Sequence, residues 1–256
     1  MTGIAVLGLH RGGTSAVAGV LYHLGVFMGD QLLEASKDNP RGYFEDRRFM
    51  ELHTEIMGGD WKRPVDNFER DIWPEYKDEY TALVREFEEH ELWGVKDPRL
   101  CYCLPLLQEV VGDGLRVICV FRDPWCARDS LVERGGHTEM EAWIISIEHM
   151  AYMLNATIRS PRVLYVEYDL LVDRPIDSVT AIAEFLDVEV KQEAIDFIDP
   201  DLRHWDHIEW LTEDEERQRA NREPAACCPH CGTYGACTYM NEEHIPRCAK
   251  LHGGEE

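Results

Sequence analysis

The stretch that decides the fold is MTGIAVLGLHRGGTS, residues 1–15. An apolar run at residues 4–7 leads into a glycine-rich loop that contains Arg11 and ends in the hydroxyl side chains of Thr14 and Ser15. Glycines let backbone N–H groups approach an anion, and the helical pattern that follows adds unpaired donors and a positive dipole end. The loop therefore predicts a phosphate-binding site. The alternative is a glycine-rich turn that serves packing alone.

The loop departs from the phosphate loop of NTP-hydrolysing proteins at one position. Gly8 and Gly13 have the spacing of G-x-x-x-x-G-K-[ST], but Thr14 stands where the lysine belongs. In NTPases that lysine acts on the transferred phosphate. The cation here is Arg11, three residues earlier, so the loop suits holding a phosphate rather than transferring one.

Composition limits the classes of protein to consider. The chain has 256 residues, of which 45% are hydrophobic, enough for one sizeable domain with an appendage. Its formal net charge of -23 argues against nucleic acid and anionic membranes as partners, although a few clustered arginines can still bind an anionic ligand. Because we find neither a long apolar run nor a basic leader, we expect a cytoplasmic protein.

Short apolar strands alternate with helical patterns. Strands are predicted at 4–7, 92–95, 116–121 and 163–166, and helices at 15–24, 45–57, 75–90, 100–111, 123–134, 139–158 and 175–186. This order predicts an α/β fold with three αβα layers and a central parallel sheet, where ligands bind at the carboxyl ends of strands. The composition changes near residue 212, so we expect a domain at 1–211 and a charged linker with a Cys/His-rich tail at 212–256.

A second motif is VFRDPWCARDS, residues 120–130. The predicted strand delivers Arg122 at its carboxyl end, and Ser130 lies about two helical turns further on. Both can converge on one anion, with the guanidinium as a planar fork of donors. The alternative is an exposed arginine beside a serine on a helix surface.

The two motifs together resemble the PAPS-dependent sulfotransferase family, which has a P-loop-like fold. In that family the first loop binds the 5′-phosphosulfate end of the donor, and the later arginine and serine bind the 3′-phosphate. The segments NPRGYFED (39–46), WGVKDPR (93–99) and DPDLRH (199–204) resemble bacterial members in particular, so the likeness extends over about residues 1–205. The resemblance implies binding of PAPS, with PAP as product, by Arg11, Gly12, Gly13, Thr14, Ser15, Arg122 and Ser130.

Sulfuryl transfer to a hydroxyl or amine needs a general base and cations at the leaving oxygen. We expect Glu45 to be the base, with Asp97 and then His53 as alternatives. Glu45 can instead be a carboxylate that stabilises a helix N-terminus, and Asp97 an ion-paired anchor. Arg11 then faces the leaving phosphate.

Lys96 or Arg99 can steady the sulfuryl oxygens. No catalytic metal is required by this logic, because Arg122 stands where a metal-binding aspartate would follow the central strand.

The sequence says less about the residues that would bind the acceptor. Arg203 and His204 close over the nucleotide or belong to a charged surface loop. The loop at 62–73, with Trp61, Phe68 and Trp73 near its ends and middle, can line an acceptor pocket or form a lid. Family members act on sugars, peptidyl tyrosines, lipids and small phenols, and the sequence does not choose among them.

The tail carries a separate prediction. The segment CCPHCG at 227–232 contains the C-P-x-C-G pattern of a zinc knuckle. A structural zinc site would use Cys228, Cys231, Cys237 and Cys248, with His244 as an alternate ligand. The alternative is a flexible tail with free thiols. We expect the other cysteines, Cys101, Cys103, Cys119 and Cys126, to pack in the core.

Two other function classes remain at this point. One is a P-loop-like nucleotide kinase or NTPase, against which the missing lysine at position 14 and the Arg122 motif argue. The other is a non-catalytic nucleotide-binding protein whose tail docks a partner.

Overall fold

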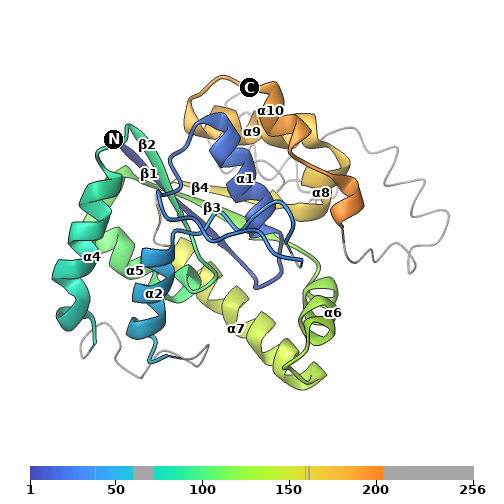
Figure 1. Ribbon diagram of the computed structural model, residues 1–256, viewed down its shortest axis with the longest axis horizontal. Coiled ribbons are helices and arrows are strands. Elements are labelled where there is room, and N and C mark those ends of the chain that lie inside the picture. Colours follow the sequence, from blue (N-terminus) through green and yellow to red (C-terminus); the bar gives the residue numbers. More distant parts are fainter. Residues whose placement is uncertain (38, 60–71, 159, 161, 204–256) are drawn as a thin grey trace, which may run out of the picture.

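The computed structural model describes residues 1–37, 39–59, 72–158, 160 and 162–203. Strands and helices alternate along the chain, as the sequence predicts (Figure 1). Their order is β1 (Thr2–Gly8), α1 (Thr14–Leu24), α2 (Arg47–Ile56), α4 (Trp73–Phe87), β2 (Leu92–Lys96), α5 (Leu100–Val111), η1 (Gly112–Gly114), β3 (Leu115–Phe121), α6 (Pro124–Arg134), α7 (Glu139–Thr157), β4 (Val163–Glu167), α8 (Tyr168–Asp173), α9 (Pro175–Leu186), α10 (Gln192–Asp196) and η2 (Pro200–Leu202).

The four strands form one parallel sheet in the order β2-β1-β3-β4. β1 lies inside the sheet, where Ala5 is paired with Val95 on one side and Val117 on the other. Parallel strands covered on both faces read as continuous apolar runs, which is the pattern of β1 and β3. The predicted α/β class with a central parallel sheet is confirmed. The carboxyl ends of the four strands meet at one edge, where the two motifs that are predicted to bind anions begin.

Helices cover both faces of the sheet (Figure 1). Successive residues of β1 point to opposite faces, so Ile4 packs into one core and Ala5 into the other. The first core includes residues of α1, α8, α9 and α10, and the second includes residues of α2, α4, α5 and α7. The cores therefore hold β1 and the loop that follows it in a fixed position.

Two local predictions were wrong. The helix expected from residue 45 begins at Arg47, because the side chain of Asp46 accepts the N–H of Arg48 and caps it. Glu45 therefore lies before the cap and does not open the helix. Trp73 belongs to α4 rather than to a loop: it is 4% exposed, and its indole N–H donates to Glu109 at 2.8 Å. Trp61 and Phe68 lie outside the described residues.

Cys101, Cys103, Cys119 and Cys126 are buried and free, which confirms the prediction of core packing. Burial raises the pKa of Cys101 to about 12 and that of Cys126 to about 11, and it also raises the pKa values of Cys103 and Cys119. None of the helices in the described part of the chain is long and apolar enough to cross a bilayer. The predicted boundary at residue 211 lies beyond the described residues.

Candidate active site

The loop after β1 takes a strained path. Arg11 has a φ of 66°, in the left-handed region that non-glycine residues seldom occupy. Gly13 caps α1 with a φ of 86°, and a Cβ there would lie 2.1 Å from Cδ2 of Tyr168. No side chain caps α1, so the N–H groups of its first turn suit an anion. Only a glycine fits at position 13, for reasons of both torsion and space.

Arg11 joins the two motifs that the sequence analysis singled out. Its Nε donates to Oγ of Ser130 at 2.9 Å, and its carbonyl accepts from the guanidinium of Arg122 at 3.0 Å. The Arg122 guanidinium also lies over the ring of Tyr168, 4.8 Å from its centroid. The sequence predicted two anion sites at opposite ends of a nucleotide. In the structure the two motifs share Arg11 and form one cluster.

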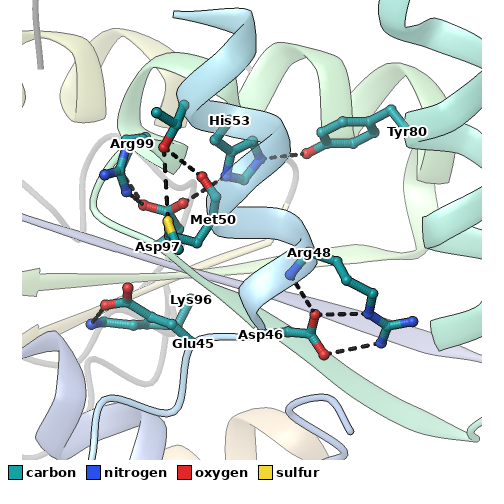
Figure 2. Close-up of polar contacts among 10 residues, drawn as sticks. Glu45, Asp46, Arg48, Met50, His53, Tyr80, Lys96, Asp97 and Arg99 are labelled. Carbon is teal, nitrogen blue, oxygen red and sulfur yellow. Dashed lines mark hydrogen bonds and ion pairs between the residues drawn. The ribbon is translucent and has the colours of Figure 1, made fainter. Parts of the chain in front are cut away.

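A buried ion pair joins the end of β2 to the segment before α2 (Figure 2). Lys96, the last residue of β2, pairs with Oε1 of Glu45, and its Nζ also donates to Oγ of Ser15 at 3.2 Å. Both side chains of the pair are less than a tenth exposed. Burial raises the pKa of Glu45, and Lys96 opposes this rise without cancelling it. The site thus holds a carboxylate of raised pKa one side chain away from the glycine loop.

Asp97 is enclosed by its own partners (Figure 2). Its Oδ1 accepts from the backbone N–H and the guanidinium of Arg99, at 2.9 and 3.0 Å, and its Oδ2 lies 2.9 Å from Nδ1 of His53. Burial would raise the pKa of Asp97, but the hydrogen bonds from His53 and Arg99 hold it below its usual value. The residue is therefore a buried anion whose oxygens are already engaged.

The proton positions in this network follow from Tyr80. Its hydroxyl lies 3.0 Å from Nε2 of His53, and burial raises its pKa well above 10, so the phenol stays protonated. Tyr80 then donates to Nε2, and Nδ1 of His53 donates to Asp97. The chain Tyr80–His53–Asp97–Arg99 runs from a buried phenol to a guanidinium at the cavity wall.

A cavity of about 320 Å³ lies at the carboxyl edge of the sheet. It is bounded by the glycine loop, the segment 39–45 before α2, the end of β2, and residues near α8 and η2. The basic residues of its lining are His10, Arg11, Arg41, Lys96, Arg99, Arg122 and Arg134, and the acidic ones are Glu45 and Asp199. A chain of net charge -23 thus concentrates cations in this cavity.

Several predicted site residues are not among the described residues that line the cavity: Gly12, His53, Asp97, Ser130 and Arg203. Arg203 instead pairs with Asp173 at the end of α8. His204 and all the predicted zinc ligands lie outside the described residues, so the zinc site stays a prediction.

The family model described as "Sulfotransferase family" matches residues 3–192, nearly three quarters of the chain. The chain belongs to the sulfotransferase family of enzymes. A search of curated proteins finds no significant match.

Solved structures with similar folds also include sulfotransferases. The sulfotransferase domain of the curacin biosynthetic pathway is 16% identical with a TM-score of 0.49, over 81% of each chain. The sulfotransferase domain of the Synechococcus PCC 7002 olefin synthase is 17% identical with a TM-score of 0.47, over 100% of this chain and 96% of that one. Retinol dehydratase, solved with androsterone and inactive cofactor PAP, is 14% identical with a TM-score of 0.37, over 97% and 78%.

Sequence reasoning missed several residues that line the cavity, among them Arg41, Arg134, His10 and Tyr168. His10 is half-buried in the cavity wall, and burial together with neighbouring basic residues lowers its pKa well below 6.5. The position of His10 next to Arg11 in the glycine-rich loop could have indicated that it belongs to the site. Tyr168 opens α8 directly after β4 and stacks under Arg122. The position of Tyr168 directly after a strand could have indicated a site residue, but the short helix α8 was not predicted.

Proposed function

We propose that this sulfotransferase moves a sulfuryl group from PAPS to a hydroxyl or amine acceptor. One observation carries the proposal: a cation-lined cavity brings together the glycine loop, the Arg122 motif and the buried Lys96–Glu45 pair. A nucleotide kinase would instead need a lysine at position 14, where the chain has Thr14. The sulfuryl-transfer proposal gives roles to Arg11, Lys96 and Arg122, the three cations that join the loop, the Arg122 motif and the ion pair.

The residues of the cavity suit such a donor. Three cationic side chains, Arg11, Lys96 and Arg122, and the uncapped N-terminus of α1 face one space of nucleotide scale. When bound, PAPS supplies a sulfuryl group on a phosphate leaving group. In this proposal Arg11, Gly12, Gly13, Thr14 and Ser15 hold the 5′-phosphosulfate end.

The other end of the nucleotide falls to the second motif. We assign the 3′-phosphate to Arg122 and Ser130, with Arg11 bridging to them. Because Arg122 is fixed by the Arg11 carbonyl and the Tyr168 ring, its fork of donors is held in place before the ligand arrives. Arg203, which pairs with Asp173, closes over the nucleotide from the end of η2.

Glu45 is the proposed general base. Its carboxylate accepts the proton of the attacking hydroxyl, and its raised pKa brings it nearer to neutral pH, where a base is most effective. Lys96 favours the anionic form of Glu45, and we also assign its ammonium group, which donates to Ser15, to the sulfuryl oxygens. Asp97 acts through Arg99 as a positioning residue, because its own oxygens are engaged.

The decisive experiment is transfer of labelled sulfate from PAPS to a panel of sugars, tyrosyl peptides, lipids and small phenols. Transfer that is lost in Glu45→Gln while PAP binding persists supports the proposal. Thermal shift adds a test of the donor: stabilisation by PAP without magnesium favours the sulfotransferase, and stabilisation only by ATP with magnesium favours the kinase or NTPase. PAP binding with no transfer to any acceptor would favour the non-catalytic module.

For the tail we keep the proposal of a structural zinc held by Cys228, Cys231, Cys237 and Cys248, with His244 as the alternate ligand. Thiolate ligands bind zinc with a free energy that also folds the surrounding segment. Elemental analysis of the purified chain should find one zinc per chain, and replacement of Cys231 by serine should remove it. Purified protein without zinc, and with no zinc uptake, would contradict the proposal.

A further inference from the structure

Helix α7 presents a row of exposed aliphatic side chains on the face opposite its buried one. One face packs into the domain and consists of small or medium side chains: Ala142, Ser146, His149, Met153 and Ala156. The other face carries larger aliphatic side chains that are exposed: Met140, Ile144, Ile147, Ala151, Leu154 and Ile158, here called the α7 stripe. A surface helix ordinarily carries charged or polar residues on the face opposite the core, whereas this face of α7 carries a row of aliphatic side chains. The α7 stripe therefore indicates a surface that another chain covers.

The spacing of the stripe is that of a helix-pairing seam. Its six positions follow one another at intervals of 4, 3, 4, 3 and 4 residues, which is the heptad pattern of a and d positions. Ile144, Ala151 and Ile158, the last of which caps α7, fall at a positions, and Met140, Ile147 and Leu154 fall at d positions, so every a and d position of the helix is apolar. Glu141 and Glu148 flank the seam at e positions. We propose that a second copy of this chain covers the stripe, so that two α7 helices pair across a two-fold axis.

The area agrees with a dimer. Met140, Ile147 and Ile158 are 68%, 60% and 82% exposed, and Ile144 and Leu154 are 46% and 42% exposed. The stripe leaves on the order of 600 Å² exposed per copy, so pairing would bury about 1,200 Å² in total, the lower end of a standard interface. The pairing surface also widens at one side, where Trp125 of α6 is 48% exposed and packs on Trp143 of α7 with ring centroids 4.6 Å apart.

The length of the stripe favours a second copy over the chain's own tail. α7 has 19 residues, so the seam is about 28 Å long. In residues 204–256 the large apolar residues gather at 205–211, a stretch of seven residues, and the remainder has no 4-3 repeat of comparable length. A second α7 matches the stripe in both length and spacing.

The test is the oligomeric state of the full chain. Size-exclusion chromatography with light scattering should give twice the chain mass of 29.6 kDa over a wide range of concentration. Ile147→Lys should raise the dissociation constant by at least about tenfold, because it places two lysines at the seam. The matched control is Ile176→Lys on α9, where the replaced side chain is equally exposed at 63%, and it should remain dimeric.

Folding of each variant is checked by circular dichroism and by its melting temperature. If Ile147→Lys fails to fold, Ile158→Lys replaces it, because Ile158 lies at the exposed end of α7 and makes little contact with the domain. A monomeric wild-type chain would overturn the proposal. That outcome is also expected if the chain's own tail covers α7. A dimer whose dissociation constant is unchanged in the folded α7 variant, Ile147→Lys or its replacement Ile158→Lys, would also overturn it.

Discussion

The segments after β1 and β2 lie side by side at the carboxyl edge of the sheet but are built differently. After β1, the loop at 9–13 offers backbone N–H groups and one strained arginine, Arg11. After β2, Lys96, Asp97 and Arg99 are side chains engaged with one another or with α2 and the segment before it. The first segment is open to a ligand, and the second is largely saturated by the protein itself.

The two segments differ in what their formation requires. A site made of backbone groups needs only the right torsions, and glycines supply them locally. A site made of side chains needs partners from distant parts of the chain, such as Glu45 for Lys96 and His53 for Asp97. We therefore expect substitutions in the loop after β1 to weaken binding of the sulfate donor. Substitutions after β2 should divide into those that lower kcat and those that lower stability.

The largest effect is expected for Glu45→Gln. Losing a general base costs roughly 10²–10⁴ in kcat. In the wild type, kcat should fall as pH falls through the Glu45 pKa, which burial raises above its usual value of 4.5, because only the carboxylate accepts a proton. The variant should lack this acid limb in a pH profile.

Two variants sharpen that measurement. Glu51→Gln, on the exposed side of α2, should leave the rate and its pH profile unchanged. His10→Gln should keep the acid limb. If the limb disappears in His10→Gln and persists in Glu45→Gln, the base is His10 and the assignment to Glu45 is wrong.

Arg11→Ala should rank next, with a loss of about 10²–10³ in kcat, because a cation that faces the leaving phosphate is removed. It should also weaken PAP binding, since Ser130 loses the Nε donor of Arg11, while the backbone carbonyl at position 11 still accepts from Arg122. Isothermal titration with PAP separates the binding loss from the rate loss. Arg85→Ala on α4, a 61% exposed side chain, serves as the surface control, and equal behaviour of the two variants would remove Arg11 from the site.

Asp97→Asn should act mainly on stability. Breaking a largely buried charge pair costs about 3 kcal/mol of unfolding free energy, since Arg99 loses its anion. The folded pKa of Asp97 lies below 3.8, so its contribution is present above about pH 4 and is lost as pH falls through the folded value. The variant should therefore show a weaker loss of stability in acid.

Denaturant titrations at several pH values measure this effect. Asp78→Asn, an exposed residue of α4, is the matched control. If Asp97→Asn keeps full stability but loses as much activity as Glu45→Gln, Asp97 is itself catalytic and the contrast between the two segments fails.

Tyr80→Phe should give the smallest effect, about 1–2 kcal/mol of unfolding free energy, because Nε2 of His53 loses its donor. Activity of the folded enzyme should change little, since Tyr80 is three contacts away from the cavity. Tyr22→Phe removes a hydroxyl from a half-exposed side chain and should be neutral. A large loss of kcat with unchanged stability would show that the network reaches the reaction directly.

The sequence was sufficient for features that depend on local pattern. The strand–loop–helix at residues 2–24, with its closing Gly25, and the strand that ends at Arg122 follow from apolar periodicity and from glycine and proline positions. Sheet class follows from the alternation of strands and helices. These elements carry most of the proposed donor site, so the position of that site follows from local pattern alone.

Other features depend on contacts between distant residues, which no local pattern encodes. Nothing near Arg11 indicates that its side chain meets Ser130, 119 positions away. The burial of Asp97 by His53 and the pairing of Glu45 with Lys96 likewise join segments 44 and 51 residues apart. Glu45 was expected to open a helix, whereas the side chain of the next residue, Asp46, caps that helix.

The four core cysteines have a practical consequence. A thiol reacts as thiolate, and a pKa of about 12 at Cys101 leaves almost none of it ionised at neutral pH. A thiol reagent should therefore modify Cys101, Cys103, Cys119 and Cys126 only when the core opens. The rate of the slow labelling phase then measures how often the sheet and its helices open. The wild-type chain suffices for this measurement, because no probe has to be introduced.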